Sequence, residues 1–197
     1  MSSYWPITEA KRTVFSGAED HITEHVRECI RFLRRVCQVE RVREGDKRTL
    51  RLRVTVLSQS STQQTDEDPK ETASFTIDRS IDEVKELHRM VVYWSKKHVE
   101  LNACYQAGVC EYCAQFNTKE AINAWPHGLM KLVLSGEARL DTLALRVSEL
   151  VHQATLFEDL VQRKDVRCDG VEHIPSIVAR FLLKDVDQSS LGGQTTP

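Results

Sequence analysis

Apolar and polar residues alternate without interruption over residues 49–57 (TLRLRVTVL), the clearest strand pattern in the chain. The apolar set is Leu50, Leu52, Val54 and Val56, and arginines or a threonine stand between them. Because successive side chains of a strand point to opposite faces, this pattern predicts one buried face and one solvated face. Such a strand is typical of an antiparallel sheet.

Two further strands are predicted beside it. Residues 71–78 (ETASFTID) alternate in the same way, and the polar, exposed loop of residues 58–70 separates them from the first strand. On the other side, a Gly-Asp pair within residues 43–48 predicts a hairpin turn after a strand that runs from near Phe32 to Val42. We therefore expect a three-stranded antiparallel meander with a long second hairpin loop.

The segment before the sheet has a helical period. Ile22, Val26, Ile30 and Leu33 are spaced as one face of an amphipathic helix that begins at His21. The residues near Phe32 fit both the end of this helix and the start of the first predicted strand, so the boundary between the two is left open.

The chain after the third strand is mostly helical in pattern. Ser80 with Glu83 forms a capping box, which predicts a helix from Ser80 to about His98. Residues 99–116 are expected to be irregular, and residues 117–138 to hold one or two short helices. A strong helix is expected over residues 138–160 and a last one from Pro175, a favourable first helical position. The fold class is therefore α+β.

The composition argues against several classes of function but does not indicate one. The chain of 197 residues suits one domain with a tail, and its formal net charge of −2 argues against a nucleic-acid binder. Residues 1–20 lack the apolar run of a secretory peptide, and no stretch approaches about 18 apolar residues. We therefore expect a cytoplasmic protein with reduced cysteines.

An arginine at the joint between the third strand and its helix raises the question of an anion site. The first N–H groups of that helix lack intrahelical partners, and the helix dipole there is positive. A cation at this place is slightly unfavourable by itself. Arg79 beside such N–H groups would suit an anion that contacts both.

The order of these elements resembles that of the phox-homology (PX) domains. The family carries Arg-Arg-Tyr-Ser-Asp-Phe-x-x-Leu-His at the joint, where this chain has RSIDEVKELH, residues 79–88. RLDTLALRVSEL, residues 139–150, is similar to the family's late-helix pattern, and VARFL, residues 178–182, to its closing pattern. On this resemblance the chain divides into an N-terminal arm with a possible helix (1–31), a PX-like domain (32–184) and a disordered tail (185–197).

The resemblance implies a phosphoinositide-binding module, often for phosphatidylinositol 3-phosphate, on endosomal membranes. It implies a peripheral membrane protein of membrane trafficking. The sequence contains no Gly-rich phosphate loop, Gly-x-Ser-x-Gly elbow or metalloprotease His pair, so we expect neither catalysis nor a cofactor. Candidate head-group ligands are Arg79, Ser80, Lys97 and Arg139. Ser80 stands where the family has the arginine that holds the 3-phosphate, and Ile81 replaces its tyrosine. A lost charge-assisted contact of about 1.5–3 kcal/mol predicts weak, salt-sensitive binding.

Each candidate also has a structural explanation. Arg79 would then be a solvated strand-end charge, Ser80 a helix cap, and Arg139 the partner of an acid such as Asp141. Lys97 would interact favourably with the helix dipole, because it lies near the C-terminal end of the helix that begins at Ser80. The alternative function is a protein-interaction module on the same fold that has lost lipid binding.

The Cys-x-x-Cys pair is a second candidate site. Cys110 and Cys113 have the spacing of two zinc ligands, and Cys104, His98 or His127 could complete the set. Only half of a site is present in the motif, so no metal is predicted, and packed thiols are the other interpretation. Redox chemistry is disfavoured because the motif does not lie in a βαβ unit.

Overall fold

The computed structural model describes residues 23–43, 49–57, 72–103, 111–118, 121–122, 125, 136–156 and 168–186. For residues 98–103 it describes the backbone but not the side chains. The strands are β1 (Val36–Arg41), β2 (Thr49–Leu57) and β3 (Thr72–Ser80). They form one antiparallel sheet in the order β1-β2-β3. The predicted meander is confirmed, and so is the pairing of residues 49–57 with the segment that follows the polar loop.

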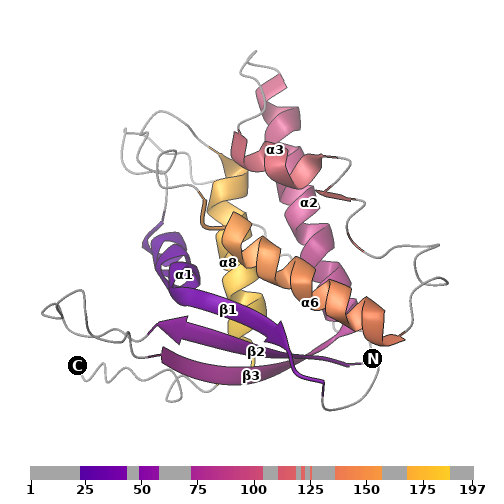
Figure 1. The fold of residues 1–197 in the computed structure, drawn as a ribbon. Coiled ribbons are helices and arrows are strands. Elements are labelled where there is room, and N and C mark those ends of the chain that lie inside the picture. The colour runs from indigo at the N-terminus through magenta and orange to yellow at the C-terminus, as the bar shows by residue number, and fades with distance from the viewer. Residues whose placement is uncertain are drawn as a thin grey trace, which may run out of the picture.

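The two faces of the sheet differ as the alternation predicts. Leu50, Leu52, Val54 and Val56 are buried on the face that the helices cover (Figure 1). The other face carries polar cross-strand pairs, and Arg51 donates two hydrogen bonds of 2.7 Å to Asp78 of β3. This pairing lowers the pKa of Asp78 even though partial burial opposes the shift.

Five helices of the described part of the chain complete the α+β fold. Their bounds are α1 (Glu24–Arg35), α2 (Ile81–Ala103), α3 (Glu111–Asn117), α6 (Gly136–Gln153) and α8 (Asp169–Leu183). The last helix, α8, packs against both α1 and α2 and runs between them, while α6 lies on β1 and β2 (Figure 1). No described helix is long and apolar enough to cross a membrane.

One hydrophobic core joins the sheet to the helices. It includes Leu33 of α1, Tyr112 of α3, Val147 of α6 and Val178 of α8, together with the apolar face of β2. The expected boundary between residues 31 and 32 lies inside α1, and Cys29 and Leu33, on either side of it, both belong to this core.

The first helix and the first strand do not overlap, because the helix ends directly before the strand begins. The apolar stripe of α1 stays buried to Leu33, and the helix ends at Arg35, so the strand begins at Val36 rather than near Phe32. Thr23 caps the start of α1, because its side chain accepts a hydrogen bond from the Val26 N–H at 3.4 Å.

Three predictions of helix extent were wrong. The last helix begins at Asp169 and contains Pro175 in its interior, because Val171 and Ile174 are already buried against the core. Residues 99–116 were expected to be irregular, yet α2 continues to Ala103 and α3 begins at Glu111. The helix expected over 138–160 is α6, which ends at Gln153. Most of the segment 117–138 and of the tail 185–197 lies outside the described residues.

Candidate functional site

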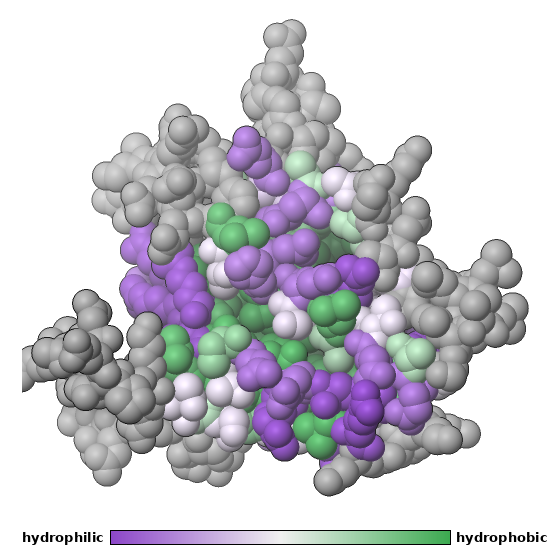
Figure 2. All heavy atoms as spheres, in the orientation of Figure 1, coloured by the Kyte–Doolittle hydropathy of each residue, from purple (hydrophilic) through white to green (hydrophobic). Residues whose placement is uncertain are grey.

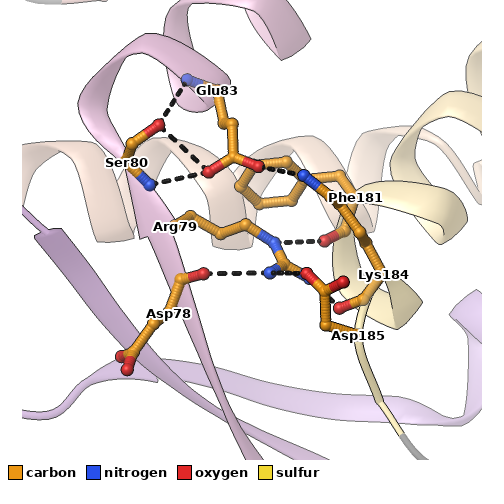
Figure 3. Close-up of polar contacts among 7 residues, drawn as sticks. All are labelled: Asp78, Arg79, Ser80, Glu83, Phe181, Lys184 and Asp185. Carbon is orange, nitrogen blue, oxygen red and sulfur yellow. Dashed lines mark hydrogen bonds and ion pairs between the residues drawn. The ribbon is translucent and has the colours of Figure 1, made fainter. Parts of the chain in front are cut away.

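Arg79 is buried where β3 ends, and its guanidinium faces the C-terminal end of α8. Its side chain is only 3% exposed. Nε donates a hydrogen bond to the carbonyl of Phe181 at 2.8 Å, and one terminal nitrogen donates to the carbonyl of Lys184 at 2.5 Å. The other terminal nitrogen donates to the carbonyl of Asp78 at 2.9 Å and lies 3.5 Å from the carboxylate of Asp185. The guanidinium therefore binds the polypeptide itself (Figure 3).

The register of the sheet places Arg79 on this inner face. It is paired with Leu50 of β2, a fully buried residue, so both side chains point toward the helices. Burial lowers the pKa of Arg79, and the nearby carboxylates of Glu83, Asp185 and Asp78 oppose that shift.

The capping box beside Arg79 is formed as predicted. The Glu83 N–H donates to Oγ of Ser80 at 3.2 Å, and the Ser80 N–H donates to the Glu83 carboxylate at 2.9 Å. The other Glu83 oxygen pairs with Nζ of Lys184 at 2.5 Å (Figure 3). Burial alone would raise the pKa of Glu83, but the hydrogen bonds from Lys184 and Ser80 outweigh it and hold that pKa below its usual value.

The two remaining head-group candidates, Lys97 and Arg139, make no hydrogen bond or ion pair with Arg79 or Ser80 in the part of the chain that the structure describes. Lys97 donates a hydrogen bond to the phenol oxygen of Tyr93 at 3.1 Å, one turn earlier in α2. Arg139 lies in the first turn of α6, and its Nε atom is buried without a hydrogen-bond partner. Asp141, the acid that sequence proximity suggests as its partner, accepts a hydrogen bond from Arg41 of β1 at 2.9 Å.

A shallow depression lies between α2, α3 and α6. Its apolar wall includes Val91, Phe116 and Leu150, and its polar wall includes Arg146 and Glu149, which form an ion pair. Figure 2 shows that small apolar groups are interspersed with polar residues on the face it displays, rather than joined into one apolar patch. The sequence offered one indication of this site, the late-helix pattern that contains Arg146.

The cysteine site differs from the one that spacing suggests. Sγ of Cys113 lies 3.5 Å from Sγ of Cys168, a residue that the sequence pattern did not connect with it. Cys104, Cys110 and His127 lie outside the described residues, and so does the side chain of His98. Among the residues that are described, no group of three His, Cys, Asp or Glu side chains could hold a metal ion. The described residues therefore do not decide between a zinc site and packed thiols.

A histidine–tryptophan pair joins α8 to α2. The rings of His173 and Trp94 are stacked with their centroids 3.6 Å apart. Burial lowers the pKa of His173, and the carboxylate of Asp169 opposes the shift. The imidazole is therefore held toward its neutral form.

Comparisons of the chain with models of protein families, with curated proteins and with solved structures found no match. The resemblance to PX domains thus rests on the quoted motifs and on the order of the elements. The α+β architecture with its three-stranded meander is compatible with it.

Proposed function

We propose that this protein is an interaction module on a PX-like scaffold in which the arginine at the strand-to-helix joint has a structural role. Recruitment to a membrane would then depend on a protein partner rather than on a head group held by Arg79. The observation that carries this proposal is the burial of Arg79 against the end of α8, with hydrogen bonds to three backbone carbonyls.

The energies favour the internal contacts of Arg79 over a lipid. Each hydrogen bond to a charged group is worth about 1.5–3 kcal/mol. A phosphate could replace at most two of the three with a bidentate contact, and the carbonyls of Phe181 and Lys184 would lose their donor. Ser80, in turn, has its hydroxyl in the capping box with Glu83. Neither residue offers a gain for binding a head group.

Arg139 supports a second candidate, residual binding of an anionic head group. Its Nε atom is buried without a hydrogen-bond partner. Arg139 lies in the N-terminal turn of the 18-residue helix α6, where the helix dipole is positive. A single guanidinium without Arg79 would give weak binding that becomes useful only with a second contact, such as a partner or a dimer.

Vesicle sedimentation distinguishes the two candidates. Phosphatidylcholine vesicles with and without each phosphoinositide are incubated with the purified chain at physiological salt. The interaction-module proposal expects equal, background binding to all of them. Phosphoinositide-dependent binding that Arg139→Ala abolishes would instead establish the second candidate. The matched control is Lys97→Ala, which removes an exposed cation from the neighbouring helix and is expected only to reduce such binding.

A further inference from the structure

Two cysteines that are far apart in the sequence meet inside the molecule. Cys113 lies in α3, Cys168 directly precedes α8, and their Sγ atoms are 3.5 Å apart across a separation of 55 residues. Cys113 is fully buried, whereas Cys168 keeps 6% of its surface exposed. A disulfide bond is about 2.05 Å long, so the two sulfurs need to approach each other by only about 1.5 Å.

The first turn of α8 is shaped around the sulfur of Cys113. A Cβ atom placed on Gly170 would lie 2.5 Å from Sγ of Cys113 and 3.5 Å from Sγ of Cys168. Real Cβ atoms do not approach sulfur so closely, so only glycine fits at this position without a shift. The absence of a side chain on Gly170 is what allows α3 to bring its thiol against the start of α8.

The position of Cys168 favours its reaction. It is the N-cap residue of α8, with extended backbone angles of φ −133° and ψ 106°. Its side chain makes no capping hydrogen bond to the N–H groups of the first turn, so the positive end of the helix dipole is what would favour its thiolate. Both residues are buried, but Cys168 keeps 6% of its surface exposed and Cys113 none, which favours Cys168 as the first to meet a small oxidant.

We propose that Cys113 and Cys168 form a reversible disulfide when the protein meets a hydroperoxide. The Cys168 thiolate attacks hydrogen peroxide; an S–O bond forms, the O–O bond breaks, and the leaving hydroxide takes a proton to become water. The Cys113 thiolate then attacks the sulfur of this sulfenic acid. An S–S bond forms, the S–O bond breaks, and a second water leaves after protonation. The two thiols lose two electrons and two protons, which the peroxide takes up.

A small thiol reverses the reaction. Two molecules of it reduce the bond through a mixed disulfide and leave as their own disulfide. Such a bond would be transient in a reducing compartment, as disulfides of sensor proteins are. In the oxidised form α3 is tied to α8, and α3 supplies Phe116 to the depression against α2 and α6. Oxidation would therefore hold one wall of that depression in place.

The test maps the bond in the wild-type chain. The protein is treated with hydrogen peroxide, its remaining thiols are alkylated, and it is digested with trypsin and a glutamate-specific protease. Cleavage after Glu111 separates Cys113 from Cys104 and Cys110, so the linked peptides identify the partner. We expect a Cys113–Cys168 link that dithiothreitol removes. We also expect an oxidised form with a Tm higher by roughly 5–15 °C, since the bond closes a long loop.

Single cysteine substitutions test the proposed disulfide bond without peptide mapping. Cys168→Ser places a favoured N-cap residue before α8 and should fold, yet it should lose the peroxide-dependent rise in Tm. Cys37→Ser, at an exposed cysteine of β1, should retain that rise. The proposal is overturned if Cys113 links to Cys110 or Cys104, or if both thiols remain alkylatable after peroxide and unfolding. One zinc per chain that protects these thiols from peroxide would also overturn it, in favour of a metal site.

Discussion

The guanidinium of Arg79 at the end of β3 donates a hydrogen bond of 2.8 Å to the carbonyl of Phe181 in the last turn of α8. The final carbonyls of a helix have no intrahelical donor, and the helix dipole there is negative. A cation that is slightly unfavourable at the start of α2 is thus favourable at the end of α8. The Arg79–Phe181 contact explains why a buried arginine stands at the joint between strand and helix.

Removal of Arg79 should destabilise the fold. We expect Arg79→Ala to lower the free energy of unfolding by about 2–4 kcal/mol, because it leaves buried carbonyls of α8 without a donor. Denaturant unfolding followed by circular dichroism measures this. The matched control is Arg89→Ala, which removes an exposed arginine that pairs with Glu86 within α2 and should cost about 0–0.5 kcal/mol. Equal effects of the two substitutions would contradict the structural role of Arg79.

Glu83 should make stability depend on acid pH. Its pKa is lowered in the folded state, so its contribution is fully present above the unfolded value of about 4.5 and is lost as the pH falls through the folded pKa. Glu83→Gln should therefore be less stable than the wild type at pH 7, and the difference should shrink below about pH 4.5. Urea titrations over this range test the expectation. A difference that stays constant with pH would show that the carboxylate charge plays no part.

Local pattern was enough to predict the sheet and the capping box. The alternation of β2 fixes which side chains are buried, since a shift by one residue would expose Leu52 and Val54 and bury two arginines. Ser80 and Glu83 are only three residues apart, so their mutual hydrogen bonds follow from the geometry of one helical turn. Features of this kind need no knowledge of the rest of the chain.

The missed features depend on contacts between distant segments. Two of the three carbonyl acceptors of Arg79, those of Phe181 and Lys184, lie more than 100 residues further along the chain, and no sequence spacing indicates that the end of α8 reaches β3. Cys168 was overlooked as the partner of Cys113 for the same reason. The start of α8 was misplaced because Pro175 is favourable at a first helical position, while burial of Val171 and Ile174 outweighs the hydrogen bond that an interior proline removes.

Gly170 should tolerate no larger residue. We expect Gly170→Ala to lower the free energy of unfolding by about 1–3 kcal/mol, because its methyl group would overlap Sγ of Cys113. This cost exceeds the gain of about 1 kcal/mol that alanine brings to a helix interior. Gly136→Ala at the start of α6 is the matched control, since its Cβ would meet no atom within 4 Å, and it should be neutral or slightly stabilising. Thermal unfolding of both variants tests the contrast, and a stabilised Gly170→Ala would refute it.

His173 should add a second pH dependence, near neutral pH. Because burial lowers its pKa from 6.5, the folded state binds this proton less readily than the unfolded state does. Stability is then fully present above about pH 6.5 and falls as the pH drops through the folded pKa. His173→Phe keeps a ring to stack on Trp94 but cannot be protonated, so it should flatten the decline between neutral and mildly acidic pH. His152→Gln, at an exposed position near the end of α6, should leave the decline unchanged. A wild-type stability that stays level as the pH falls to 5.5 would show that protonated His173 is accommodated between α8 and α2.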